Sequence, residues 1–197
     1  DLVRIMSIHK SKGLEFPVVL VLGLGSPFNR MDEREALQLH RRLGLGPMAF
    51  DAGKRLRRTT LARETLLRQQ QREAMSEQVR LLYVALTRAR ERLVLIGSTG
   101  RSQGVKLLGK WSRPLETALL ADAGSFLDWV GAAALRHPDA AAWREQAAAA
   151  VEVLPCDAPL SVQLVDSACL PAPAAPAPAV VLPPAASGET AEEIGRA

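Results

Sequence analysis

Apolar positions in the first hundred residues follow two patterns, one with the period of a helix and one typical of buried strands. Apolar runs near Val3, Val18 and Leu93 predict three central strands, because strands covered on both faces of a parallel sheet are continuously apolar. The helical pattern places apolar residues at Met75, Val79, Leu82 and Leu86. The order of strand, long helix and strand predicts an α/β fold.

The helical pattern predicts a helix from about Thr60 to Arg90, capped by Thr59 or Thr60. One stripe of this helix is expected to be buried, with Tyr83 in the core or at its edge and Arg88 projecting elsewhere.

A polar segment, residues 7–15, separates the first two predicted strands. It combines one histidine, two lysines, two serines, a glycine and a glutamate. Ligands of open α/β sheets bind at the carboxyl ends of strands, where this segment is predicted to lie.

Two segments carry a resemblance to a known family. The sequences IHKSKGLEFPVV (8–19) and EQVRLLYVALTRARERLVL (77–95) resemble motifs V and VI of the UvrD-like superfamily 1 DNA helicases. Within that group the chain is similar to the AddA family of helicase and nuclease subunits over most of residues 1–155. The supporting segments are Phe28-Asn29, Leu43–Gly46, Thr60–Arg63, Ser76-Glu77 and Ser125–Val130.

The resemblance implies a bacterial ATP-dependent DNA helicase and exonuclease that unwinds and resects double-strand ends for recombinational repair. Its cofactors would be ATP and Mg²⁺. Its partners would be single-stranded DNA, duplex ends and an AddB-like subunit. The fold implied is the C-terminal part of a RecA-like domain of the P-loop NTPase type, followed by a small mixed region and a Pro/Ala linker.

The resemblance also implies site residues. Arg88 would be the catalytic arginine that contacts the γ-phosphate, and Glu15 would face the nucleotide, with Gly13 permitting close backbone approach. The residues expected toward the DNA strand are Ser7, His9 and Lys12. For His9, a packed and hydrogen-bonded histidine is an equal alternative. No metal ligand is expected in this chain.

We expect four regions along the sequence. They are 1–113, the end of the second RecA-like domain with an insertion at 24–58; 114–168, a helical and strand connector; 169–188, the Pro/Ala linker; and 189–197, the truncated start of a nuclease domain. The insertion is not expected to contribute to the core.

Smaller elements are predicted inside these regions. Met31–Leu43 fits a short amphipathic helix, and Ser125 with Asp128 fits a capping box that opens another helix. Further segments are a helix at 139–150, with Trp143 in the core, and strands at 151–154 and 160–165.

Composition limits the function classes. The 197 residues can bury one good core, no apolar run reaches membrane-spanning length, and the start at Asp1 without a signal peptide indicates an excised fragment. Cys156 and Cys169 lack metal-ligand spacing, which favours free thiols in a reducing, cytoplasmic compartment.

Charge leaves several functions open. The net charge is +4, and Lys54–Arg72 holds seven cations against the single acid Glu64. This basic window fits a solvated helix surface, a DNA phosphate contact or a docking face for a partner subunit.

The segment Gly104–Trp111 has the spacing of a phosphate-binding loop, but Trp111 stands where a hydroxyl must hold magnesium, so the sequence excludes that loop. The isolated chain is therefore expected to be inactive. Two other functions remain open, a UvrD- or RecB-type helicase without a nuclease and a non-catalytic docking module.

Overall fold

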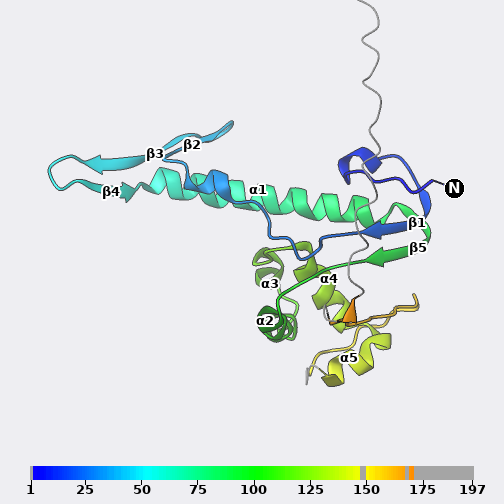
Figure 1. Ribbon diagram of the computed structural model, residues 1–197. Coiled ribbons are helices and arrows are strands. Elements are labelled where there is room, and N and C mark those ends of the chain that lie inside the picture. Colours follow the sequence, from blue (N-terminus) through cyan, green and yellow to red (C-terminus); the bar gives the residue numbers. More distant parts are fainter. Residues whose placement is uncertain (1, 147–149, 167–168, 171–197) are drawn as a thin grey trace, which may run out of the picture. The chain divides into compact units, whose positions relative to one another are not determined.

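The computed structural model describes residues 2–146, 150–166 and 169–170, in two units, Asp1–Val162 and Gln163–Ala197. Nearly all regular structure lies in the first unit (Figure 1). Its strands are β1 (Phe16–Val21), β2 (Leu37–His40), β3 (Gly44–Asp51), β4 (Leu56–Thr59) and β5 (Ala89–Leu95). Its α-helices are α1 (Leu61–Leu86), α2 (Arg101–Trp111), α3 (Thr117–Ala121), α4 (Phe126–Leu135) and α5 (Ala141–Gln146). Three 3₁₀ turns, η1 (His9–Ser11), η2 (Met31–Arg34) and η3 (Pro138–Ala140), complete the elements. No described helix is long and apolar enough to cross a membrane.

Strands β1 and β5 pair in parallel, with Val18 opposite Arg92 and Val21 opposite Leu95. Two of the three predicted strands are therefore confirmed. The third, near Val3, is wrong, because residues 2–7 form no strand and Val3 and Ile5 are almost fully exposed. An apolar run becomes a strand only when a neighbour completes its hydrogen bonds, and no described strand pairs with this one.

The missing strand changes where the polar segment lies. Residues 7–15 follow an irregular segment and lead directly into β1 at Phe16. They therefore lie at the amino ends of β1 and β5, and the expected position after the carboxyl end of a strand is wrong.

The long helix α1 is confirmed, together with one of its two candidate caps. Thr60 Oγ1 accepts a hydrogen bond from the backbone N–H of Arg63 at 3.2 Å. The helix ends at Leu86, four residues earlier than predicted, because the chain turns at Thr87 into β5. Leu82 is buried, whereas Tyr83 is 68% exposed, so the prediction of Tyr83 in or beside the core is wrong. Tyr83 is one residue, or about 100°, further around the helix than Leu82.

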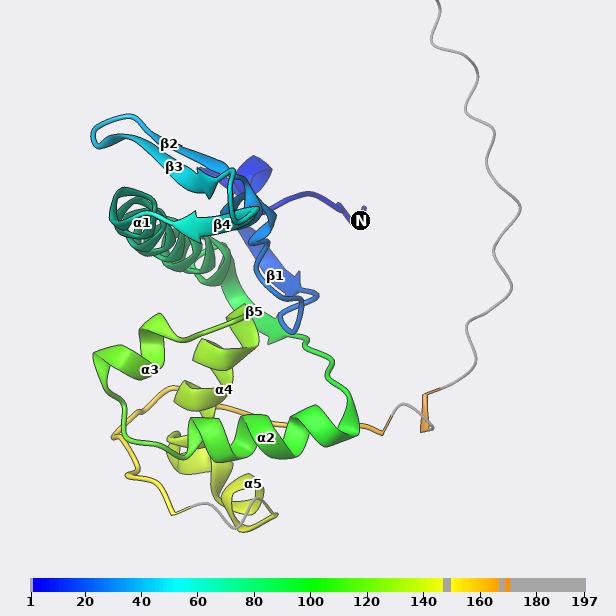
Figure 2. The same ribbon diagram turned by 90° about the vertical axis from the view of Figure 1, so that its left-hand side faces the viewer.

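The segment between β1 and α1 forms an antiparallel meander in the order β2-β3-β4 (Figure 2). The helix predicted at Met31–Leu43 is wrong, because only the single turn η2 forms before β2 begins. Alternation of Leu37, Gln38 and Leu39 has the period of a strand, and pairing with β3 satisfies their backbone groups.

The meander packs on α1 through a glycine and a buried arginine. A Cβ atom at Gly46 would lie 2.7 Å from Arg63 Cα, so only glycine fits this contact. The Arg63 side chain is buried and donates from Nη2 to the carbonyls of Glu33 (2.8 Å) and Glu35 (2.7 Å).

A small core joins the strand pair to α1 and α4. Val21, Leu24 and Ala85 are buried together, and Phe126 and Leu127 pack against them. The backbone N–H of Leu127 donates to the Leu24 carbonyl at 2.8 Å. Leu24 lies at the start of the insertion that was expected to stay outside the core. It belongs to the core instead.

A second core lies among α2, α4 and α5. Residues 104–111 lie within α2, so they form no phosphate-binding loop. Trp111 is buried; its ring packs edge-on against Trp143 at 5.8 Å, and its indole N–H donates to Asp128 at 3.4 Å. The start of α4 at Ser125 is confirmed, but Asp128 accepts from the N–H of Gly124 (2.6 Å) and Ser125 makes no side-chain cap.

The remaining predictions concern the C-terminal part. The helix predicted at 139–150 is represented by η3 and α5. The strands predicted at 151–154 and 160–165 are wrong, because no adjacent described strand pairs with either segment. In the second unit, the Cys169 N–H donates to the Asp166 carbonyl at 2.9 Å. Residues 171–197, with most of the expected linker and the start of the nuclease domain, lie outside the described residues.

Candidate nucleotide site between the two motifs

Pairing of β1 with β5 brings the two motif segments together although they are more than seventy residues apart. Phe16 lies opposite Ala89, and its N–H donates to the Arg88 carbonyl at 2.9 Å. The end of the polar segment therefore lies beside the end of α1, where the sequence placed Arg88.

Local hydrogen bonds give the polar segment a defined path. Ser11 is buried, and its hydroxyl donates to the Ile8 carbonyl at 2.7 Å across η1. Gly13 has a φ of +81°, a conformation that side-chain-bearing residues rarely adopt. Nothing lies within 4 Å of a Cβ placed there, so conformation rather than space favours glycine.

The Arg88 side chain is half-buried and fixed by three hydrogen bonds. Its Nε donates to the Val84 carbonyl, its Nη1 to the Leu14 carbonyl and its Nη2 to the Thr87 hydroxyl, each at 2.9 Å. One acceptor belongs to motif V and two to the end of α1. The guanidinium is therefore held at the junction of both motifs.

All three acceptors of Arg88 are neutral. Among the described residues, no ion pair joins Arg88 to a carboxylate. A fixed guanidinium whose charge is not neutralised is suited to an anionic ligand such as a phosphate.

Glu15 lies directly before β1, and its partner is Arg90. The Arg90 Nε and Glu15 Oε2 atoms are 2.8 Å apart. The hydrogen bond from Arg90 and the charge of Arg90 lower the pKa of Glu15, and the charge of Arg88 adds a smaller effect. Sequence reasoning missed Arg90; its only signal was a charge opposite to that of Glu15, and the β1–β5 register was needed to place the two together.

The three residues expected toward DNA lie on or beside η1. Ser7, His9 and Lys12 are exposed, so the alternative of a packed histidine at position 9 is wrong. None of the three side chains has a hydrogen-bond partner among the described residues. They are therefore available to an external ligand.

The basic window divides into three environments. Arg63 is buried, and Arg68 pairs with Glu64 at 3.2 Å. The remaining cations are exposed and have no carboxylate partner in the described part of the chain: Lys54, Arg55, Arg57, Arg58 and Arg72. Four of these five lie in or before β4.

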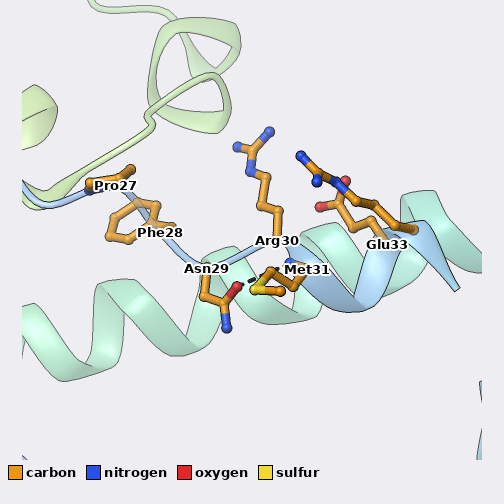
Figure 3. Close-up of a pocket in the computed structure, with 7 residues that line it drawn as sticks. Pro27, Phe28, Asn29, Arg30, Met31 and Glu33 are labelled. Atoms are coloured by element: carbon orange, nitrogen blue, oxygen red, sulfur yellow. Dashed lines mark hydrogen bonds between the residues drawn. The ribbon is translucent and has the colours of Figure 1, made fainter.

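An open depression of about 600 Å³ lies on the segment that follows β1 (Figure 3). Its walls are Pro27–Met31, Glu33 and Arg34, and the Met31 N–H donates to Asn29 Oδ1 at 3.0 Å. None of its lining residues belongs to motif V or VI. Within the described residues, no three His, Cys, Asp or Glu side chains gather as a metal site.

Comparisons with known proteins agree with the motif assignment. The UvrD-like helicase C-terminal domain matches residues 1–100. The chain is 49% identical over 159 residues to an ATP-dependent helicase/nuclease subunit from Pelotomaculum thermopropionicum, covering 77% of this chain and 12% of the relative. For the proteins of the same name from Heliobacterium modesticaldum and Bacillus cytotoxicus, identity is 46% over 167 residues and 41% over 182 residues. These matches cover 79% and 88% of this chain, and 12% and 14% of the relatives.

The chain thus spans about an eighth of the length of these relatives. Their names confirm the resemblance to helicase and nuclease subunits that the two motifs indicated. Because the family model matches half of the chain, the chain belongs to the UvrD-like helicase C-terminal domain family.

Proposed function

We propose that this chain is the part of an ATP-dependent DNA helicase and nuclease that supplies one wall of the ATP site. The observation that carries the proposal is Arg88, whose guanidinium is fixed between motifs V and VI and has only neutral acceptors. The names of the relatives, which join helicase and nuclease activities in one ATP-dependent subunit, support the same function.

In this proposal Arg88 stabilises the negative charge that develops on the phosphoryl oxygens during transfer to water. Its Nη atoms would exchange the Leu14 carbonyl or the Thr87 hydroxyl for a phosphate oxygen. A charge-assisted bond to phosphate is stronger than a bond to a neutral carbonyl, which favours that exchange when nucleotide binds.

The other residues would bind and orient. Glu15 would accept a hydrogen bond from the nucleotide, and the turn at Gly13 would let the backbone approach it. Ser7, His9 and Lys12 would contact the DNA strand. Mg²⁺ would accompany the nucleotide phosphates, and the described residues supply no metal site of their own.

The wider assignment follows from the same family. The whole protein would act in the bacterial cytoplasm on single-stranded DNA and duplex ends, with an AddB-like partner subunit. It would couple strand separation to nuclease cleavage during recombinational repair.

The test is ATP hydrolysis by the full-length parent with saturating single-stranded DNA. Arg88→Ala is expected to lower turnover about 10³-fold or more, the range for a catalytic arginine, with a smaller effect on nucleotide binding. Arg88→Lys is expected to restore little, because an ammonium lacks the planar fork. Arg92→Ala, at an exposed position on β5, is the control and should hydrolyse ATP at close to the parental rate. A folded Arg88→Ala protein with near-parental turnover would overturn the proposal.

A further inference from the structure

The ion pair between Glu15 and Arg90 is poorly placed to stabilise the fold. The side chains are 51% and 67% exposed, and such exposed pairs add little to stability because solvent screens both charges. Yet this short contact joins the two motif segments beside Arg88.

Three charged residues lie near the start of β1 and β5. Glu15 precedes β1, Arg90 lies in β5, and Arg88 lies two residues before Arg90. Both arginines lower the pKa of Glu15, and Arg90 has the larger effect. Glu15 is therefore within the electrostatic reach of Arg88 although it is bonded to Arg90.

The Arg88 Nη1 donates to the carbonyl of Leu14, the residue before Glu15, at 2.9 Å. Without Arg90, Arg88 would therefore be the motif VI arginine beside Glu15. A carboxylate bonded to Arg88 would neutralise the charge that the proposed function requires there, because the present acceptors of Arg88 are all neutral. Pairing with Arg90 removes that competition.

We propose that Arg90 is a positioning residue that holds Glu15 toward the nucleotide and keeps it from pairing with Arg88. The inference rests on the proposed function and deepens it.

The experiment uses the full-length parent and four variants, Arg90→Ala, Arg90→Lys, Glu15→Gln and the double variant Glu15→Gln with Arg90→Ala. Two quantities are measured: the Kd of a fluorescent non-hydrolysable ATP analogue, and the kcat of ATP hydrolysis with saturating single-stranded DNA. Arg92→Ala is the matched control from the same strand, and thermal unfolding of each variant checks its folding.

Glu15→Gln is expected to raise Kd about tenfold through loss of a charged acceptor, with kcat little changed. Arg90→Ala is expected to raise Kd and to lower kcat, each about three- to tenfold, as Glu15 moves to Arg88. In the double variant no carboxylate can reach Arg88, so kcat should return to near the parental value. Arg90→Lys should retain most of both quantities, because the pair uses a single N–H donor that an ammonium can replace.

Recovery of kcat in the double variant is a result that a purely structural role of Arg90 would not give. If Glu15→Gln raises Kd but the Arg90→Ala protein binds and turns over like the parent, Arg90 has no positioning role and the proposed function stands. If the double variant is slower than Arg90→Ala alone, the inference also fails. If Glu15→Gln leaves Kd unchanged, Glu15 does not face the nucleotide, and both the inference and that part of the proposed function are wrong.

Discussion

At the scale of single residues, the site depends on how one cation is held. Arg88 has three neutral acceptors, and two of them come from the last turn of α1 and from Thr87, the residue after that helix. The sequence motif placed Arg88 in the site, but the motif alone did not show that Thr87 and Leu14 orient it. Thr87, the short polar residue next to the proposed catalytic arginine, is thus a second candidate for mutation.

Thr87→Val removes the hydroxyl that accepts from Arg88 Nη2 and retains the branched shape of the side chain. We expect kcat of the full-length parent to fall about three- to tenfold, because one of three orienting bonds is lost. Nucleotide affinity should change less than kcat. Steady-state ATP hydrolysis measures both effects, and an unchanged kcat would show that Thr87 does not orient Arg88.

At the scale of elements, sequence patterns predicted three elements whose partners lie within the chain, but they missed the β2-β3-β4 meander. The helix α1 and strands β1 and β5 were found because each packs or pairs with another part of the first unit. The strand near Val3 failed for lack of a partner, since no described strand pairs with residues 2–7. The helix predicted at Met31–Leu43 failed for the opposite reason, because pairing with β3 stabilised β2 over a helical alternative.

Gly46 lies where β3 packs closely on α1. Gly46→Ala would place Cβ within 2.7 Å of the Arg63 Cα atom, so β3 must move away from the helix at a cost of about 1–3 kcal/mol. Hydrogen exchange in the full-length parent should show faster exchange of β3 and α1 amides.

The matched control is Gly109→Ala in α2, where nothing lies within 4 Å of the added Cβ. That change should leave exchange unchanged or slow it slightly, because alanine is the better helix former. Equal effects of the two substitutions would contradict the packing role of Gly46.

The exposed cations of the β3–β4 hairpin give a separate prediction about DNA binding. Arg57 and Arg58 are exposed and unpaired among the described residues, whereas Arg68 is paired with Glu64. The logarithm of the DNA association constant falls linearly with the logarithm of the salt concentration. If the hairpin contacts DNA phosphates, Arg57→Ala combined with Arg58→Ala should make this slope less steep by about 1.8 for duplex DNA. Arg68→Ala should change the slope by less, because Arg68 is already paired with Glu64.

Binding of the full-length parent to labelled duplex ends at several salt concentrations measures these slopes. An unchanged slope in the double variant, with folding intact, would remove the hairpin from the DNA contact and favour docking to a partner protein.

At the scale of the whole molecule, the described chain leaves apolar side chains uncovered along β1 and just beyond it. Along β1, Leu20 is 59% exposed, and Leu22, just beyond its end, is 69% exposed; both would be buried in a sheet covered on both faces. A two-stranded sheet is marginal by itself. In the proposed parent, of which this chain is about an eighth, other segments would cover these surfaces and complete the nucleotide site.

The last prediction is that residues 1–197 alone do not hydrolyse ATP, even with single-stranded DNA present. In the proposed site, Arg88 and Glu15 would supply charge and a hydrogen-bond acceptor at one side of the nucleotide, whereas catalysis of phosphoryl transfer also needs a phosphate-cradling loop and bound metal. The only sequence with the spacing of such a loop is in α2. Within the described residues, no three His, Cys, Asp or Glu side chains gather as a metal site.

Phosphate release by the purified chain, compared with the full-length parent under the same conditions, tests this prediction. Circular dichroism must first show that the helices are formed, so that inactivity is not caused by unfolding. Turnover by the folded chain at a rate comparable with the parent would mean that Arg88 works without the rest of the parent. The proposal that this chain supplies only one wall of the ATP site would then be wrong.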